Sequence, residues 1–305
     1  MAVCRTLLPA ALRLEAPVRD GLVRIWEGLL AQGAIQFSVI EDPTRSGPDS
    51  IEAFGASVFV SDDFTGEFCA RPRPYLPSIV YERIAGGASP VLSTAQLRAD
   101  NSDDGLNLAV LHFGLRHPDM ENERTRRALQ AGNAAFYFLH AGYRLKLLIN
   151  EVYGPQHAHY MSAGGFRLVT DFRDGSLDGV ADEEQPYLFA QRREWIAPGA
   201  VNPLALLFHA PRPQLGLAAR EQAVILRALL NESDNEIASA MTISLDAVKK
   251  TWRRAYDRVA VAAPSLLGKA TAAASNRRGT EKRRHLLEYL RDHLEELRPT
   301  SKRAG

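Results

Sequence analysis

The chain has few cysteines and no long apolar stretch. Only Cys4 and Cys69 occur among its 305 residues, far apart and without a CxxC pair, which argues against a disulfide framework and against a cysteine-ligated zinc site. No window approaches the roughly 18 to 20 uninterrupted apolar residues that a membrane helix needs. The N-terminal apolar run is broken by Arg13 and is too weak for a signal peptide. We therefore expect a cytoplasmic protein without a membrane partner.

The chain also lacks a marked overall charge, because its net charge of +1 combines two regions of opposite sign. Residues 1–214 hold 20 Lys and Arg against 25 Asp and Glu, whereas residues 215–305 hold 17 against 11. Hydrophobic residues at 46% and charged residues at 24% are globular values, and 305 residues suffice for two domains. An acidic body followed by a basic region suggests that only the last third meets a polyanion.

The first two thirds of the sequence mix helical and strand patterns. Apolar spacing predicts a helix over residues 18–32 and a long helix over residues 124–154. Alternating or continuous apolar runs predict strands over residues 34–43, 52–62, 106–115, 165–172 and 186–195. The order lacks the regular βαβ repeat of a doubly wound fold, so we predict an α+β sensory or regulatory domain over residues 1–208.

Helical patterns dominate after the proline-containing segment His209–Gly216, where the charge changes sign. They cover residues 219–230, 235–241, 245–259 and 280–299, the last with Thr280 as its N-cap. We predict an all-α helix-turn-helix domain over residues 209–263, then a linker and a charged C-terminal helix over residues 264–305. The leucines of this last helix share one side, which favours packing on the preceding domain over dimerisation; they are Leu286, Leu287, Leu290, Leu294 and Leu297.

The segment "TISLDAVKKTWRRAYDRV", Thr242 to Val259, predicts a helix with one apolar and one basic side. At 100° per residue the apolar side chains fall in one sector, formed by Val248, Trp252, Ala255, Tyr256 and Val259. Ser244 stands at the N-cap position. The short helix before it offers a docking surface, and the join between the two is short. Such helices must cross steeply, as in a helix-turn-helix whose second helix enters the DNA major groove.

These segments resemble the C-terminal DNA-binding domain of LuxR-type transcriptional regulators, over about 45 residues without a gap. The matching positions are Arg220, Glu221, Ser233, Glu236, Ile237, Ala238, Ile243, Ser244, Val248, Lys249, Arg253, Arg254 and Tyr256. The sequence departs from the family at Asn231, where Gly is usual, at Ala247, where Thr is usual, and at Thr251, where His is common. The resemblance implies double-stranded DNA as the partner and a homodimer as the working form.

Seven residues are predicted to contact DNA: Ser244, Lys249, Lys250, Thr251, Arg253, Arg254 and Arg258. A basic helix face is more often solvated surface, and Trp252 and Tyr256 are expected in the core. The combination of cap, short preceding helix and basic face favours DNA binding. Further phosphate contacts are expected from the C-terminal helix, at Arg277, Arg278, Lys282, Arg283 and Arg284. We predict a transcriptional regulator rather than an enzyme, with no catalytic, cofactor-binding or metal-binding residue.

The N-terminal region does not identify the signal that the predicted sensory domain detects. The residue sets of phosphoryl receivers and of acyl-homoserine-lactone sensors are not recognisable, so a small-molecule effector of another kind is expected. The segment "RIAGGA", Arg83–Ala88, resembles the R-x-x-G-x-A phosphate loop of GNAT-type acetyltransferases, which gives a GNAT-like acyltransferase as the alternative function. A glycine-rich turn is the commoner explanation, and Pro90 follows where that family has an unbroken helix.

The histidines of "GPQHAHYM" raise the question of a metal site. His157 and His159 stand two residues apart, with His140 and His112 as further candidates. Two residues at this spacing share a face only on a strand, and no carboxylate nearby completes a ligand set. Histidines without a ligand role are therefore the better interpretation.

Overall fold

The computed structural model describes the chain except for residues 174–176, 178, 198, 200–202, 268–276 and 302–305. The chain forms two compact units. The N-terminal unit contains Met1–His140 and Arg144–His209, and the C-terminal unit contains Ala210–Gly305 together with the turn Ala141–Tyr143. The N-terminal unit mixes helices with a six-stranded sheet, which makes the protein an α+β protein.

The sheet of the N-terminal unit has the strand order β1-β2-β3-β4-β6-β5. Its strands are β1 Ile35–Glu41, β2 Ile51–Val60, β3 Leu106–Leu115, β4 Leu145–Tyr153, β5 Arg167–Asp171 and β6 Pro186–Arg192. All neighbouring strands are antiparallel except β3 and β4, which are parallel. A parallel pair needs a crossover connection, and α6 (Glu123–His140) supplies it.

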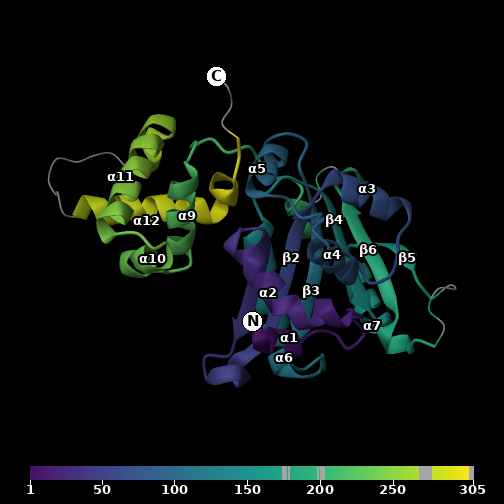
Figure 1. The fold of residues 1–305 in the computed structure, drawn as a ribbon. Helices are drawn as coiled ribbons and strands as arrows, with labels where there is room; N and C mark the ends of the chain where they lie inside the picture. Colours follow the sequence, from purple (N-terminus) through teal and green to yellow (C-terminus); the bar gives the residue numbers. More distant parts are fainter. Residues whose placement is uncertain (174–176, 178, 198, 200–202, 268–276, 302–305) are drawn as a thin grey trace. The chain divides into compact units, whose positions relative to one another are not determined.

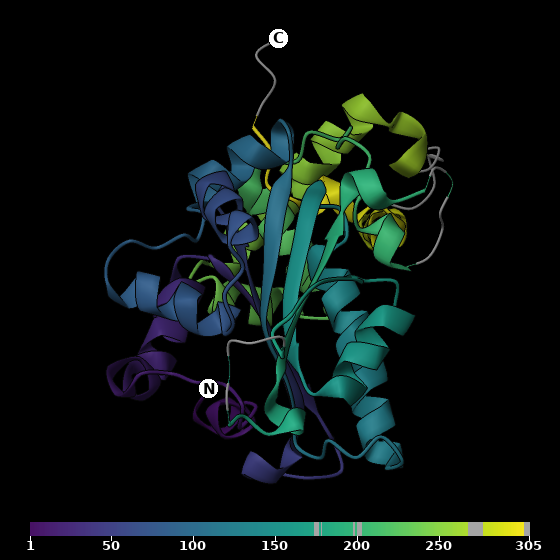
Figure 2. The same cartoon turned by 90° about the vertical axis from the view of Figure 1, so that its right-hand side faces the viewer.

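Helices cover both faces of this sheet (Figures 1 and 2). On one face, α2 (Ala16–Ala31) and α4 (Leu76–Ala85) bury Trp26 and Tyr81 against Phe54 of β2 and Leu111 of β3. The Trp26 indole Nε1 donates a hydrogen bond to the Tyr81 hydroxyl at 2.8 Å. The other face holds α6 and α7 (Pro155–Ala163), which contact β2 and β4 respectively.

Five predicted strands are confirmed, but the long predicted helix over residues 124–154 is wrong. The chain leaves α6 at His140, turns through Gly142, whose φ is +86°, and continues as β4. The apolar residues Leu145, Leu147, Leu148 and Ile149 extend the helical pattern in the sequence. Pairing with β3 and β6, which is not visible in the local sequence, makes them a strand.

The region between β2 and β3 contains three helices that the sequence analysis did not predict. They are α3 (Asp62–Ala70), α4 and α5 (Thr94–Ser102), and serine side chains cap α3 and α5. The proposed phosphate loop Arg83–Ala88 is wrong as an N-terminal cradle, because it lies at the carboxyl end of α4. The N–H groups of Gly86, Gly87 and Ala88 all donate to carbonyls of the last turn of that helix, so they are not directed at a ligand.

The short helix α8 (Pro203–Leu206) is the last helix of the N-terminal unit. The described elements of the C-terminal unit are all helical. They are α9 Ala219–Leu229, α10 Asp234–Ala240, α11 Leu245–Ala262, the 3-10 turn Pro264–Leu267 and α12 Arg277–Asp292, followed by the 3-10 turn Leu294–Leu297. Because α12 begins at Arg277, Thr280 is not its N-cap. Leu286 and Leu290 of α12 are fully buried, and α12 contacts α9, so the leucines pack inside this unit as predicted.

Candidate nucleic-acid interface

Hydrogen bonds fix both the start of α10 and the short turn that joins α10 to α11. Ser233 caps α10 by accepting from the Glu236 N–H, and the Glu236 carboxylate accepts in return from the Ser233 N–H at 2.7 Å. After α10, Thr242 adopts a φ of +53°, and the N–H groups of Thr242 and Ile243 donate to the carbonyls of Ser239 and Ala238. A β-branched residue in the left-handed region is uncommon, so this turn is held in place by its surroundings.

The turn between α9 and α10 explains one departure from the LuxR-type pattern. Asn231 stands where the family usually has glycine, and its φ is +66°. Asparagine is the residue other than glycine that most readily adopts the left-handed conformation at a helix end. Asn231 therefore preserves the turn that a glycine would make.

The apolar side of α11 is docked on the neighbouring helices. Val248, Ala255 and Val259 are at most 1% exposed, and Trp252 is buried too. Both α9 and α10 contact α11, and Ile237 of α10 is fully buried beside it. The remaining side of α11 consequently points outward.

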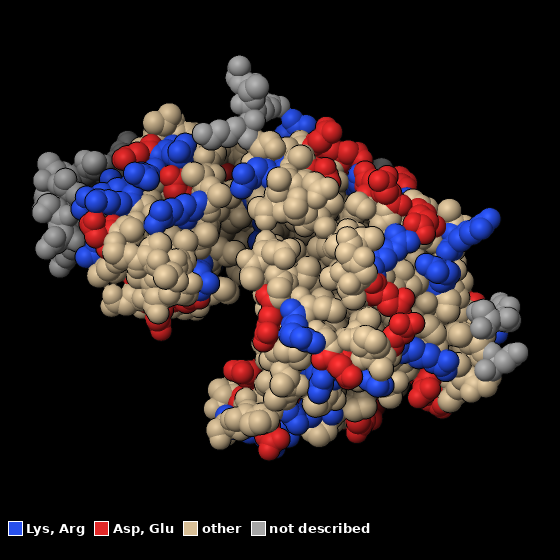
Figure 3. Space-filling model, viewed as in Figure 1, with Lys and Arg blue, Asp and Glu red and all other residues tan. Residues whose placement is uncertain are grey.

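Six of the seven predicted DNA-contacting residues are exposed, all but Thr251. Four of them form the basic group on this outward side: Lys249, Lys250, Arg253 and Arg254. Lys250 forms an ion pair with Asp246 at 2.9 Å, one turn earlier on the helix. Within the described part of the chain, Lys249, Arg253 and Arg254 have no carboxylate within ion-pair distance. Figure 3 shows Lys and Arg side chains gathered over the region of α11 and α12, with some Asp and Glu among them.

The other three predicted residues have partners within the unit. The Ser244 hydroxyl accepts from the Ala247 N–H at 3.2 Å and so caps α11. Thr251 is 4% exposed, and its hydroxyl donates to the Ala247 carbonyl at 2.8 Å. Arg258 pairs with the buried Glu221 of α9 at 2.9 Å. Thr251 is turned inward, and Arg258 holds α9 to α11.

The structure adds a cluster that the sequence analysis missed, formed by Asp234, Trp252 and Arg283. The Arg283 guanidinium lies 4.5 Å from the centre of the Trp252 ring and donates to Asp234 at 2.8 Å. The Trp252 indole also donates to Asp234, at 3.3 Å. One side chain from each of α10, α11 and α12 thus meets here. Because Arg283 is engaged in this cluster, it would give up its ion pair with Asp234 to bind phosphate.

A second missed residue is Glu296, which follows α12 and is 1% exposed. Its carboxylate accepts from the backbone N–H groups of Gln214 and Leu215 at 2.7 and 2.9 Å. Burial raises the pKa of Glu296, and these two hydrogen bonds oppose that rise. These two hydrogen bonds fix the segment that leads into α9. Nothing in the local sequence signals this long-range contact.

The candidate metal histidines lie apart from one another. His157 and His159 are on helix α7, where residues two apart do not share a face, and His157 Nδ1 bonds to the Tyr153 carbonyl. His140 forms a hydrogen bond through Nε2 with Ser57 at 2.7 Å, and His112 packs against the rings of Trp26 and Tyr81. In the residues that the structure describes, no three His, Cys, Asp or Glu side chains are grouped to hold a metal ion.

Comparison with known proteins finds no family model that matches the chain and no similar curated protein. Among the described helices, none combines the length and the apolar character required to cross a bilayer.

Proposed function

We propose that the protein is a transcriptional regulator whose C-terminal unit is a LuxR-type helix-turn-helix that binds double-stranded DNA. The observation that carries the proposal is the outward side of α11. Lys249, Arg253 and Arg254 are exposed there without an acidic partner among the described residues, while the opposite side is packed on α9 and α10. A helix held in this way presents cations to a polyanion without losing its own core contacts.

The proposed DNA contacts are of two kinds: side-chain contacts from the outward side of α11, and contacts of backbone N–H groups at its N-terminus. Lys249 and Arg253 lie one turn apart on the outward side, where a recognition helix meets base edges and phosphates. Lys250 contributes less, because it gives up its ion pair with Asp246 before it can reach a phosphate. Ser244 acts through the free N–H groups of the first turn of α11, since an anion at a helix N-terminus is stabilised.

In the proposed regulator the N-terminal unit and a second copy of the chain have roles too. The N-terminal unit acts as the sensory domain and binds a small-molecule effector. The working form is a cytoplasmic homodimer, because one module of this size contacts too few base pairs to single out an operator.

The proposal is tested by measuring DNA binding over a series of salt concentrations. Replacing Lys249 and Arg253 together with alanine should weaken binding to every duplex roughly tenfold or more and lower the salt slope by about one to two units. A matched control removes two exposed arginines of α2, Arg19 and Arg24, from the same full-length chain. If the α11 double variant binds as tightly as the control at every salt concentration, α11 is not the recognition helix.

A second candidate function, acyl transfer, is favoured by one observation on the sheet. The pairing of β3 with β4 ends at Val110 and Asn150, although β3 continues to Leu115 and β4 to Tyr153. Ligands of sheets with parallel strands bind beyond the carboxyl ends of those strands. Titration of the full chain with acetyl-coenzyme A, the acyl donor of acetyltransferases, tests this candidate. Binding of acetyl-coenzyme A together with no DNA binding would favour it over the regulator.

A further inference from the structure

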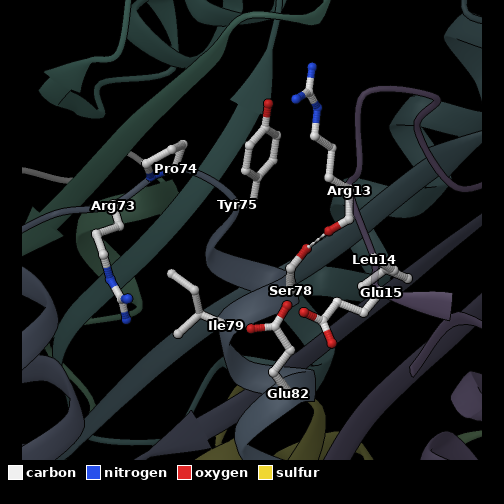
Figure 4. A pocket seen from close by; sticks show the side chains of 9 residues that line it. All are labelled: Arg13, Leu14, Glu15, Arg73, Pro74, Tyr75, Ser78, Ile79 and Glu82. Carbon is white, nitrogen blue, oxygen red and sulfur yellow. Dashed lines mark hydrogen bonds between the residues drawn. The ribbon is translucent and has the colours of Figure 1, made fainter. Parts of the chain in front are cut away.

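A pocket of about 590 Å³ opens on the N-terminal unit (Figure 4). Two segments line it. Arg13, Leu14 and Glu15 precede α2, and residues 73–82 form the entry and the first turns of α4. The Ser78 hydroxyl donates to the Arg13 carbonyl and so ties the two segments together. This volume is in the range of pockets that hold small organic ligands, about 300 to 1,000 Å³.

The wall of the pocket contains a strained residue, Tyr75. Its φ of 68° and ψ of 50° place it in the left-handed region, which a bulky side chain rarely adopts. The buried Glu151 of β4 holds it there by accepting from the N–H groups of Tyr75 and Leu76 at 2.8 and 3.2 Å. The Tyr153 hydroxyl donates to the other oxygen of Glu151 at 2.8 Å. Backbone strain that is fixed by the surrounding structure is typical of ligand sites.

The surroundings of the Tyr75 ring are also typical of a ligand site. The Arg13 guanidinium carbon lies 5.5 Å from the centre of the ring. The Tyr75 hydroxyl is buried, and it has no hydrogen-bond partner in the described part of the chain. Buried hydroxyl groups normally have a partner, so this one marks an incomplete polar environment.

Four charged side chains line the pocket, two of each sign. Arg13 and Arg73 are cationic, Glu15 and Glu82 are anionic, and all four are exposed. Figure 4 shows the Glu15 and Glu82 carboxylates near each other and the two guanidinium groups at different ends of the view, and no ion pair joins any of the four within the described residues. The side chains of Leu14, Pro74 and Ile79 form the apolar part of the lining.

We propose that this pocket binds a zwitterion of dipeptide size with apolar side chains. The ligand carboxylate lies against Arg73, its ammonium group against the neighbouring carboxylates of Glu15 and Glu82, and its side chains on Leu14, Pro74 and Ile79. A simple anion would bring its charge toward two carboxylates, and a simple cation would bring its charge toward two guanidinium groups. Only a ligand with both charges finds a partner for each, because like charges repel and opposite charges attract.

The test is a calorimetric titration of the full chain with the dipeptide Leu-Leu. N-acetyl-Leu-Leu keeps only the negative charge and Leu-Leu amide keeps only the positive one. We expect Leu-Leu to bind with a dissociation constant of about 1 mM or lower, and each single-charge form to bind at least about tenfold more weakly. Arg73→Gln and Glu82→Gln should each weaken Leu-Leu binding by about the same factor.

The matched controls are Arg126→Gln and Glu194→Gln, which change exposed residues outside the pocket lining and should leave binding unchanged. Circular dichroism verifies that all four variants are folded. Three results would overturn the proposal: no binding of Leu-Leu at about 10 mM, equal binding of the single-charge forms, or pocket variants that bind as the controls do. The titration contains no DNA, so its outcome is separate from that of the salt series on α11.

Discussion

At the scale of single residues, Glu151 links pH to the stability of the N-terminal unit. Burial raises the pKa of this carboxyl to about 7, against the opposing effects of the Tyr153 hydroxyl and the two backbone N–H groups. The folded protein therefore holds the proton more tightly than the unfolded chain, in which the pKa of this carboxyl is 4.5. Ionisation costs no stability below about pH 4.5, and the cost grows until the pH has passed about 7.

Glu151→Gln removes this cost while it keeps the shape of the side chain. The amide oxygen can accept from Tyr75 and Leu76, and the amide nitrogen can donate to the Tyr153 hydroxyl. We expect the free energy of unfolding of the variant, relative to the parent, to rise by roughly 2 to 3 kcal/mol between pH 5 and pH 8.

Urea unfolding followed by circular dichroism at several pH values measures this difference. Glu194→Gln, at an exposed position, is the control and should follow the parent at every pH. A constant difference between Glu151→Gln and the parent over this range would show that Glu151 does not titrate as described.

At the scale of elements, Ser244 combines two roles that substitution can separate. As the N-cap it stabilises α11, and in the proposed complex it stands where a phosphate approaches the first turn. Ser244→Ala should lower the free energy of unfolding by about 1 kcal/mol, because it removes the capping oxygen. Ser244→Asp keeps the cap but adds a negative charge, so it should retain stability and weaken DNA binding roughly tenfold.

Thermal unfolding and gel-shift titration of both variants check this prediction. The control is Ser93→Asp, at the N-cap of α5 in the N-terminal unit, which should change neither DNA binding nor the cap. If Ser244→Asp binds DNA as tightly as Ser93→Asp, the first turn of α11 does not face phosphate.

The elements of the C-terminal unit follow from the sequence because their signals are local. The spacing of Val248, Trp252 and Val259 gives the buried side of α11, and Ser233 and Ser244 give the helix starts. Strand β4 does not follow from the local sequence, because pairing with β3 and β6 overrides the helical apolar pattern that continues from α6.

The same distinction applies to the candidate interface. The exposure of Lys249 and Arg253 follows from helical periodicity. The inward position of Thr251 and the pairing of Arg258 with Glu221 depend on how α11 meets its neighbours. Local periodicity therefore predicts which basic residues are exposed, but not which of them pairs with a neighbouring helix.

At the scale of the whole molecule, charge separates the two units. The acidic region lies in the N-terminal part of the sequence and the basic region in the last third. In the proposed regulator this division directs DNA to the C-terminal unit and leaves the N-terminal unit to bind the effector. The leucines of α12 are buried within their own unit, so they are not available as a dimer surface.

The N-terminal unit therefore remains as the expected source of dimer contacts. Sedimentation of the full chain at micromolar concentration should show a dimer on a duplex with two half-sites one helical turn apart. A fragment of residues 210–305 should bind the same duplex more weakly, because each copy then gains no energy from a paired partner. A duplex with a single half-site is the control and should bind both proteins with similar affinity. A full chain that stays monomeric on the two-site duplex would contradict the dimer, because its two DNA-binding units would then act independently.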